Sequence, residues 1–352
     1  MIVRLLSLSL LIAGCAVEVD EAAQTPVGLS WPTPPPPPGR PVSASLVRMV
    51  RYLPSIREEC RPVHFPSDSE RALFQQAIRQ LVAGRIERAR ETLALLGFDV
   101  LDVSDGDRRY HVVQETPGPL VRGWGFYVIN LAPRRPLVLE APHPVHDWNT
   151  GIQAAELMGR LGARALIVAT THRCASKYPT ECQGRTGACR QVWGKGRYRR
   201  SDRAHAVNTL FHAAHSELLA GDPRLVAVQL HGFRRRPGRL RHVVLSDGTR
   251  LPGGRRSHSN GLARAMRRLL PRGRRALVRS CNETSRQRYL CGTHNVQGRQ
   301  ANASSNPCRR GPRRSLNRFI QIEQSMDARR PGELIEPDLL RRAMERHWPV
   351  RE

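Results

Sequence analysis

Lysine is almost absent from this chain, although the chain is strongly basic. Of its 57 basic residues only Lys177 and Lys195 are lysines, so arginine supplies 55, and the formal net charge is +27. Aromatic residues make up 5% of the sequence, and the basic segment at 233–241 (FRRRPGRLR) has none interleaved among its arginines for stacking bases. The arginine bias is typical of GC-rich codon usage. Specific nucleic-acid binding is therefore not favoured, whereas an anionic substrate fits the charge.

The sequence signals of several enzyme classes are absent as well. The chain contains no glycine-rich phosphate-binding loop, no Gly-x-Ser-x-Gly nucleophile motif and no internal repeat. These absences exclude phosphate-loop nucleotide hydrolases and serine hydrolases with a nucleophile elbow. After the first 15 residues, no apolar run reaches the length of about 20 residues that a membrane-spanning helix needs. The sequence therefore predicts a globular body without a spanning helix.

The N-terminal segment, MIVRLLSLSLLIAGC, combines Arg4, a short apolar stretch and small residues before Cys15. This pattern predicts a secretory signal peptide at 1–14. Its end resembles the lipobox of bacterial lipoproteins, which implies that Cys15 becomes the lipid-modified N-terminus and anchors the protein to a membrane. The alternative is an ordinary signal peptide with an incidental cysteine. We expect a lipid-anchored protein of the bacterial cell envelope, periplasmic or at the cell surface.

A proline-rich segment follows the expected anchor. Residues 15–42 contain the run TPPPPPGRP, which favours an extended polyproline II tether without a core of its own. Residues 43–352 are expected to form a single domain, with its core at about 136–330.

Seven cysteines remain after Cys15, and an extracytoplasmic compartment favours disulfides over a thiolate metal site. An odd number leaves one cysteine without an intramolecular partner, and the pairing stays open. Three of the seven cluster in one loop and two others bracket a second loop, so we expect disulfides to staple long loops around a site. The seven are Cys60, Cys174, Cys182, Cys189, Cys281, Cys291 and Cys308.

Helical and strand patterns alternate along most of the chain. A capped helical pattern at 67–96 with a bend at Gly84 precedes three short strand patterns, and from Pro136 onward apolar strands alternate with helices. One of these helices is expected at 203–221. Strands that are apolar throughout and separated by helices predict an α/β fold with an open, mostly parallel or mixed sheet covered by helices on both faces.

Polar residues stand at the ends of these expected strands. The strand in PLVLEAPHPVHDWNTG is followed by His143, the next strand ends near His172, and the strand VAVQL is followed by His231. In the last strand, FIQIEQS, Glu323 interrupts an apolar run, which costs free energy unless a cation or hydrogen bonds compensate it. Ligands of open α/β sheets bind beyond the carboxyl ends of the strands, so these side chains are expected to form a site.

The combination predicts a metal centre. His143, His231 and a carboxylate from the pair His146–Asp147 would supply three ligands of a zinc ion, leaving a position open for catalysis. Glu323 would move a proton to and from the attacking water. Taken singly, each histidine is more simply explained as surface or core filler; the agreement of independent strand ends is what favours the metal.

The order of these motifs, with FHAAHSELL, VQLHGF and FIQIEQS followed by ARR, resembles the N-formylglutamate amidohydrolases and poly-γ-glutamate hydrolases of the zinc carboxypeptidase superfamily. The resemblance covers roughly 136–330. It implies Zn²⁺ bound by His143, Asp147 and His231, and Glu323 as the catalytic residue. The pattern departs from the His-x-x-Glu of carboxypeptidases, because here the spacing is His-x-x-x-Asp and His146 offers a competing His-x-x-His pair. The second ligand is therefore Asp147 by the family's chemistry, or His146.

Further candidates lie near the expected mouth of the site. Arg173, Asn295 and Arg299 are predicted to bind a substrate carboxylate, since a bidentate arginine suits an acidic substrate. The second-tier candidates are His146, His172 and His212. His205 and His212 are seven residues apart, hence on one helical face, with His215 three residues further on.

These inferences predict a zinc-dependent hydrolase of amide bonds in a peptide-like, γ-glutamyl or N-acyl amino acid substrate that carries a carboxylate. The alternatives are a non-catalytic envelope lipoprotein that binds an anionic ligand or polymer, and a surface protein that binds anions through its arginines. The sequence does not determine the oligomeric state.

Overall fold

A computed structural model describes residues 42–56, 63–117, 122–189, 196–234, 242–254, 256–283, 287, 289–329 and 338–350 of the chain. Residues Gly39–Glu352 form one compact unit. The predicted signal peptide at 1–14, nearly all of the predicted tether at 15–42, the lipidation site Cys15 and Cys60 lie outside the described residues.

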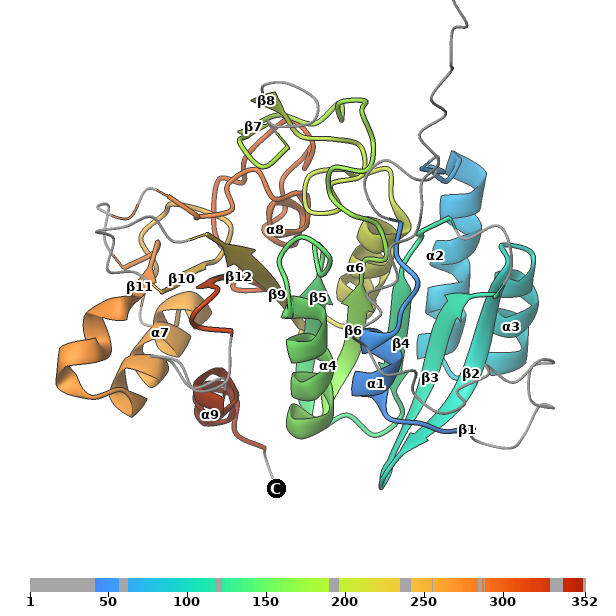
Figure 1. The fold of residues 1–352 in the computed structure, drawn as a ribbon, viewed down its shortest axis with the longest axis horizontal. Coiled ribbons are helices and arrows are strands. Elements are labelled where there is room, and N and C mark those ends of the chain that lie inside the picture. The colour runs from blue at the N-terminus through green and yellow to red at the C-terminus, as the bar shows by residue number, and fades with distance from the viewer. Residues whose placement is uncertain are drawn as a thin grey trace, which may run out of the picture. The chain divides into compact units, whose positions relative to one another are not determined.

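The fold is α/β, as predicted, and is built on one mixed ten-stranded sheet in the order β1-β2-β3-β4-β6-β5-β9-β12-β10-β11 (Figure 1). The central strands β6, β5, β9 and β12 run parallel to one another, whereas β4 and β10 pair antiparallel to β6 and β12. The strands are β1 (Val42–Ser43), β2 (Phe98–Asp105), β3 (Arg108–Glu115), β4 (Phe126–Asn130), β5 (Arg135–Ala141), β6 (Ala163–Val168), β9 (Val226–Phe233), β10 (Val243–Ser246), β11 (Val278–Ser280) and β12 (Phe319–Ser325).

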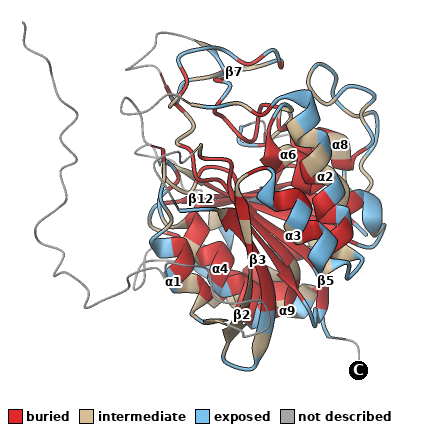
Figure 2. Cartoon of the chain, turned by 90° about the vertical axis from the view of Figure 1, so that its right-hand side faces the viewer, coloured by how far each residue is buried: buried red, intermediate tan, exposed pale blue. Residues whose placement is uncertain are grey.

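Helices cover both faces of the sheet, each burying an apolar stripe against it. One core joins the sheet to α1 (Leu46–Arg51), α4 (Thr150–Leu161), α7 (His258–Leu269) and α9 (Asp338–His347). The other joins the opposite face to α2 (Asp68–Val82), α3 (Ile86–Ala94), α6 (Leu210–Gly221) and α8 (Val296–Ala301). Figure 2 shows buried residues running through the strands and the inner sides of the helices, with exposed residues on the outer sides.

Two expected helices differ from the structure. The helical pattern at 67–96 is interrupted at Gly84, whose φ of +72° is unsuited to a helix interior, so α2 and α3 are separate helices. The helix expected at 203–221 begins only at Leu210, because the Thr209 side chain accepts a hydrogen bond from the backbone N–H of His212 and caps it. His205 therefore precedes the helix, and the prediction that His205 and His212 share a helical face was wrong.

The loops above the sheet, which carry the short hairpin β7 (Arg185–Thr186) and β8 (Gly196–Arg197), gather near α8 at the top of Figure 1. A short 3-10 helix, η1 (Arg272–Leu277), precedes β11. The expected disulfides are present: the six described cysteines pair as Cys174–Cys189, Cys182–Cys308 and Cys281–Cys291. Disulfides of this kind are typical of extracytoplasmic proteins.

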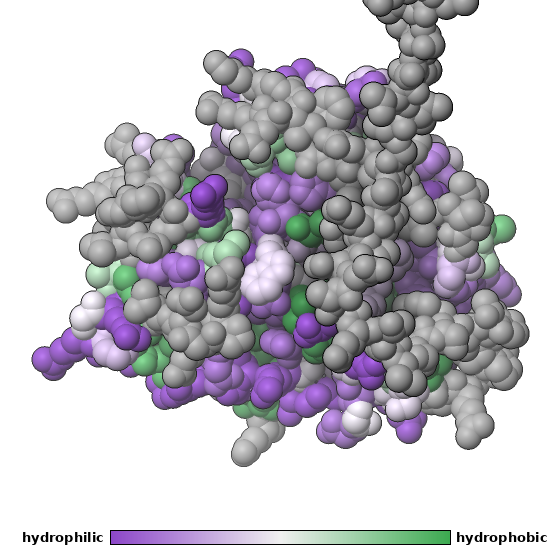
Figure 3. Space-filling model, in the orientation of Figure 1, coloured by the Kyte–Doolittle hydropathy of each residue, from purple (hydrophilic) through white to green (hydrophobic). Residues whose placement is uncertain are grey.

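Among the described residues, no helix combines the length and the apolar character needed to traverse a bilayer. The face seen in Figure 3 is largely hydrophilic where it is described, with small scattered hydrophobic areas.

Candidate metal centre

The turn that follows β5 brings two of the predicted ligands onto one side of the chain. The backbone N–H groups of His146 and Asp147 both donate to the carbonyl of His143, at 3.0 and 2.7 Å, which winds residues 143–147 into one helical turn. Side chains four residues apart lie on the same side of such a turn. His143 and Asp147 face each other, whereas the exposed His146 contacts His172.

His231, near the end of β9, completes a cluster with these two residues. The Oδ2 atom of Asp147 lies 3.4 Å from Nδ1 of His143 and 3.6 Å from Nδ1 of His231. All three residues are buried, at 1%, 3% and 4% exposure for His143, Asp147 and His231. His143 Nδ1 and Asp147 Oδ2 have no hydrogen-bond partner, which is costly for buried polar atoms unless a ligand compensates them.

The partners of the two imidazoles determine which ring nitrogen carries the proton. His143 Nε2 lies 2.8 Å from Asp202 Oδ1, and a carboxylate only accepts, so Nε2 is the donor. His231 Nε2 lies 2.7 Å from Gln229 Oε1, again an acceptor. Both rings therefore turn the lone pair of Nδ1 toward Asp147 Oδ2, and three acceptor atoms converge. This is a donor set that could hold a divalent metal ion.

The pKa shifts of His143 and Asp147 favour a positive charge between them, whereas burial lowers the pKa of His231. Burial and Arg173 lower the pKa of His143, but Asp202 and Asp147 outweigh them and raise it above its usual value. Burial raises the pKa of Asp147, yet His143 and His231 hold it well below its usual range when a proton stands between their Nδ1 atoms and the carboxylate. A proton or a metal ion at the centre would provide a partner for His143 Nδ1 and Asp147 Oδ2.

Two other groups of potential ligands are explained without a metal. Asp202 Oδ1 is 2.8 Å from both His143 Nε2 and His205 Nδ1, and Arg173 donates to Asp202 Oδ2, so these groups satisfy one another. His146 Nδ1 lies 3.2 Å from His172 Nε2, near Cys174. The sulfur of that cysteine is bonded to Cys189 and is not free to bind a metal.

Glu323 lies next to the centre on β12, where it is paired in register with His231 of β9. It is buried, and burial together with the nearby Asp147 carboxylate raises the pKa of Glu323 to about 8. Gln321 donates a hydrogen bond of 2.9 Å to Glu323 Oε1. A carboxylate in this position can take up and release a proton beside the centre.

The three predicted substrate contacts differ in their surroundings. Arg173 donates two hydrogen bonds to Asp202, at 3.1 and 2.6 Å, and retains 12% side-chain exposure. Arg299 is buried and donates to the carbonyls of Thr293, Pro307 and Cys308. Asn295 has no exposed surface and donates to Gln229 and Gln321.

His212 and His215 lie on α6, away from the three converging acceptors. His215 Nδ1 is 2.6 Å from Glu140 Oε1, and His212 Nδ1 is 3.5 Å from the amide of Gln297. Burial lowers the pKa of His212 to about 3, so its ring is neutral.

Four polar residues around the centre were not predicted from the sequence. Asp202, Gln229 and Gln321 contact His143, His231 and Glu323, and Glu140 accepts a hydrogen bond from Gln229. A signal for two of them was available, because VQLHGF and FIQIEQS both place a glutamine two residues before the functional side chain. Residues two apart in a strand share a face. Asp202 lies in a loop far from the other residues in sequence and carries no such pattern.

No family model and no curated protein matches the sequence. Among solved structures, a gene product from Agrobacterium tumefaciens matches with a TM-score of 0.36 and 12% identity, covering 60% of this chain and 85% of that one. A candidate metallopeptidase from Shewanella amazonensis matches with a TM-score of 0.28 and 14% identity, covering 81% of this chain and 97% of that one. These similarities are distant, so the site rests on its own geometry.

Proposed function

We propose that this protein is a zinc-dependent hydrolase of amide bonds in a peptide-like, γ-glutamyl or N-acyl amino acid substrate, anchored in the bacterial cell envelope by lipid on Cys15. The observation that carries the proposal is the convergence of His143 Nδ1, Asp147 Oδ2 and His231 Nδ1, two of which are buried without a hydrogen-bond partner.

The spacing of these atoms supports zinc. A tetrahedral zinc ion with bonds of about 2.0 to 2.1 Å keeps its ligand atoms roughly 3.3 Å apart. The separations of 3.4 and 3.6 Å from Asp147 Oδ2 to the two imidazole nitrogens fit this requirement. Two imidazoles and one carboxylate also form the donor set of catalytic zinc sites that keep a fourth position open.

A zinc ion held there would polarise a substrate carbonyl and acidify a water molecule. Glu323, beside His231 on the adjacent strand, would act as general base toward the attacking water and as general acid toward the leaving amine. Asp202 and Gln229 hold the two imidazoles in the tautomers that leave Nδ1 free. Arg173 remains partly exposed next to the centre, and we assign it the substrate carboxylate.

The test begins with metal analysis of the purified protein, followed by hydrolysis assays on N-acyl amino acids, γ-glutamyl polymers and peptidoglycan fragments. We expect one zinc per chain and hydrolysis of one of these classes. Glu323→Gln should retain the zinc and lose turnover, because the amide keeps the shape but accepts no proton. A Glu323→Gln protein with undiminished activity would rule out the assigned role.

A chain without metal and without activity would favour the other candidate, an envelope protein that binds an anionic ligand. The net charge of +27 supports that alternative. Binding to an anionic polymer that persists after zinc is removed by a chelator would then be the positive result.

A further inference from the structure

We infer that Asn295 is a positioning residue that sets the orientation of both His231 and Glu323 through the side-chain amides of Gln229 and Gln321. The inference rests on the proposed function, because it assigns a role within that site. Asn295 has no exposed surface, so its amide acts on other side chains of the protein.

The two glutamines and the two functional residues form parallel rows on the sheet. In the pairing of β9 with β12, Gln229 stands opposite Gln321, and His231 stands opposite Glu323. Residues two apart in a strand point to the same face, so all four side chains lie on the face covered by α6 and α8. Asn295, the N-cap residue of α8, contacts both glutamines.

The direction of the hydrogen bonds is set at one end by Glu140. The Oε2 atom of Glu140 accepts from Gln229 Nε2 at 2.9 Å, while its Oε1 lies 2.6 Å from Nδ1 of His215. Because Gln229 turns its nitrogen toward this acid, its oxygen faces His231 Nε2 at 2.7 Å. The orientation of an amide follows from such partners.

The direction is set at the other end by the cap of α8. The Asn295 side-chain oxygen accepts from the backbone N–H of Gly298 at 3.0 Å, and a backbone N–H can only donate. The nitrogen of Asn295 therefore points to the glutamines, where it donates to Gln229 Oε1 and to Gln321 Oε1, the latter at 3.2 Å.

The contact between Asn295 and Gln321 also determines how Gln321 binds Glu323. Because Gln321 accepts through its oxygen, its nitrogen faces Glu323 and donates to Oε1 at 2.9 Å. Asn295 thus orients Gln321, which binds Glu323, and together with Glu140 it orients Gln229, which binds His231. Buried hydrogen-bond networks of this kind hold their members in single orientations.

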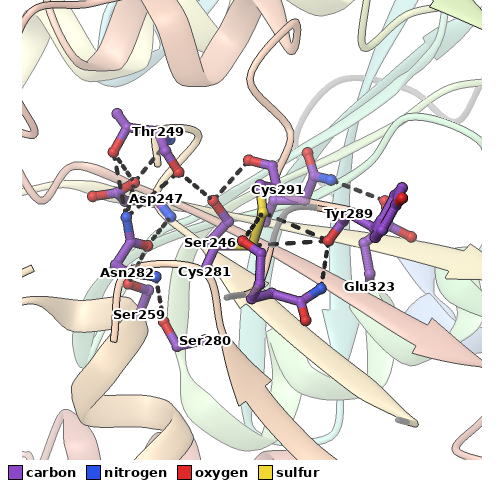
Figure 4. The surroundings of a disulfide bond; sticks show 12 residues. Ser246, Asp247, Thr249, Ser259, Ser280, Cys281, Asn282, Tyr289, Cys291 and Glu323 are labelled. Carbon is purple, nitrogen blue, oxygen red and sulfur yellow. Dashed lines mark hydrogen bonds between the residues drawn. A yellow bond between two sulfur atoms is a disulfide. The ribbon is translucent and has the colours of Figure 1, made fainter. Parts of the chain in front are cut away.

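A disulfide anchors the segment that carries Asn295. Cys281 continues from β11 and is bonded to Cys291, whose carbonyl accepts from Ser246 Oγ at 2.7 Å (Figure 4). Gly292 follows at once, with a φ of +61°, and its Cα packs so closely on the Gln321 amide that a side chain there would collide with it. The loop is therefore held against the network that Asn295 completes.

The experiment replaces the donor nitrogen of Asn295 with an acceptor oxygen. In Asn295→Asp, one carboxylate oxygen still caps α8, while the other replaces the donor with an acceptor. We expect zinc affinity to fall about 10- to 100-fold, as for other residues that orient metal ligands. We also expect kcat to fall more than KM rises.

Asn260→Asp is the matched control. Asn260 is also buried and donates two hydrogen bonds, but to the carbonyls of Gly253 and Asn282, so zinc affinity should not change.

The two arms can be separated. Gln229→Met removes the acceptor of His231 and should lower zinc affinity, whereas Gln321→Met removes the donor to Glu323 and should lower kcat while zinc affinity stays constant. A purely structural role would move both readouts together. Unchanged zinc affinity and kcat in folded Asn295→Asp would overturn the inference.

A readout without metal distinguishes this inference from the proposed function. The ¹⁵N chemical shifts of His231 report its tautomer in the metal-free protein. We expect the Nε2–H form in the wild type and a mixture of tautomers in Asn295→Asp; identical spectra would overturn the inference. A wild-type protein that binds no zinc would refute the proposed function, while the histidine spectra would still decide the role of Asn295.

Discussion

The histidines of the candidate metal centre and those between α7 and α9 lie in contrasting surroundings. His143 and His231 each have Nε2 bound by an acceptor and Nδ1 turned toward Asp147. His258 and His347 instead contact each other, with 3.0 Å between Nδ1 and Nε2, and pack against the ring of Trp348. His143 and His231 are buried, whereas His258 and His347 are half-buried, and both pairs join segments distant in sequence.

The difference lies in the carboxylates. Asp202 and Asp147 raise the pKa of His143 despite its burial. Burial, His258 and Arg264 lower the pKa of His347 to about 4, and no acid among the described residues counteracts them. The centre thus favours an added positive charge, and the α7–α9 pair resists one. Clustered histidines indicate a metal site only where acceptor atoms converge on them without donors.

The largest effect is expected from removing a ligand. His231→Ala should lose zinc and reduce hydrolysis by more than about 100-fold, since residues that only orient ligands already account for 10- to 100-fold. His258→Ala, the matched change in the other pair, should retain both zinc and activity. Metal analysis and initial rates measure this. Stoichiometric zinc in His231→Ala would contradict the assignment of His231 as a ligand. The two histidine pairs would then no longer differ in metal binding.

A smaller effect is expected from Asp202→Asn. The change removes the acceptor that fixes the His143 tautomer and leaves Arg173 with a weaker partner, so zinc affinity should fall about 10- to 100-fold. Asp222→Asn, which alters a surface pair with Arg224, is the control. Competition with a chelating dye gives the affinities, and circular dichroism verifies folding. Equal affinities in the two variants would mean that Asp202 does not orient the ligand.

His347 of the α7–α9 pair should make the stability of the folded protein depend on pH. The folded-state pKa of His347, about 4, lies below its ordinary value of 6.5, so the unfolded chain binds the proton more tightly. The free energy of unfolding therefore does not depend on His347 above pH 6.5, where its ring is neutral in both states, and it decreases as the pH falls toward 4. Denaturant unfolding at several pH values should show a loss on the order of 1 kcal/mol that is smaller in His347→Gln. Parallel pH curves for the two proteins would count against this.

The smallest effect is expected from His146→Ala. His146 is exposed and lies beside His172, outside the three converging acceptors, so zinc affinity should stay within about twofold. Asp147→Ala should lose the metal. If His146→Ala lost zinc and Asp147→Ala retained it, the competing His-x-x-His pair would be the correct ligand set.

The main layers of the fold were predictable because the patterns that specify them are local. Apolar strands alternating with helices predicted the covered sheet, and polar residues at the strand ends predicted the side at which His143, His231 and Glu323 lie. The start of α6 was not predicted, since the helical periodicity continues upstream of Thr209, where a side-chain cap begins the helix.

By itself the sequence determined the fold class, the presence of disulfides and which residue types stand where the strands end, because each depends on neighbours within a few positions. Only the tertiary structure decided which cysteines pair, that Asp147 rather than His146 faces the two imidazoles, and that Asp202, Gln229 and Asn295 orient the centre. These contacts join residues separated by up to 126 positions, and their partners are chosen by the packing of strands and loops. Local sequence patterns therefore do not predict these partners.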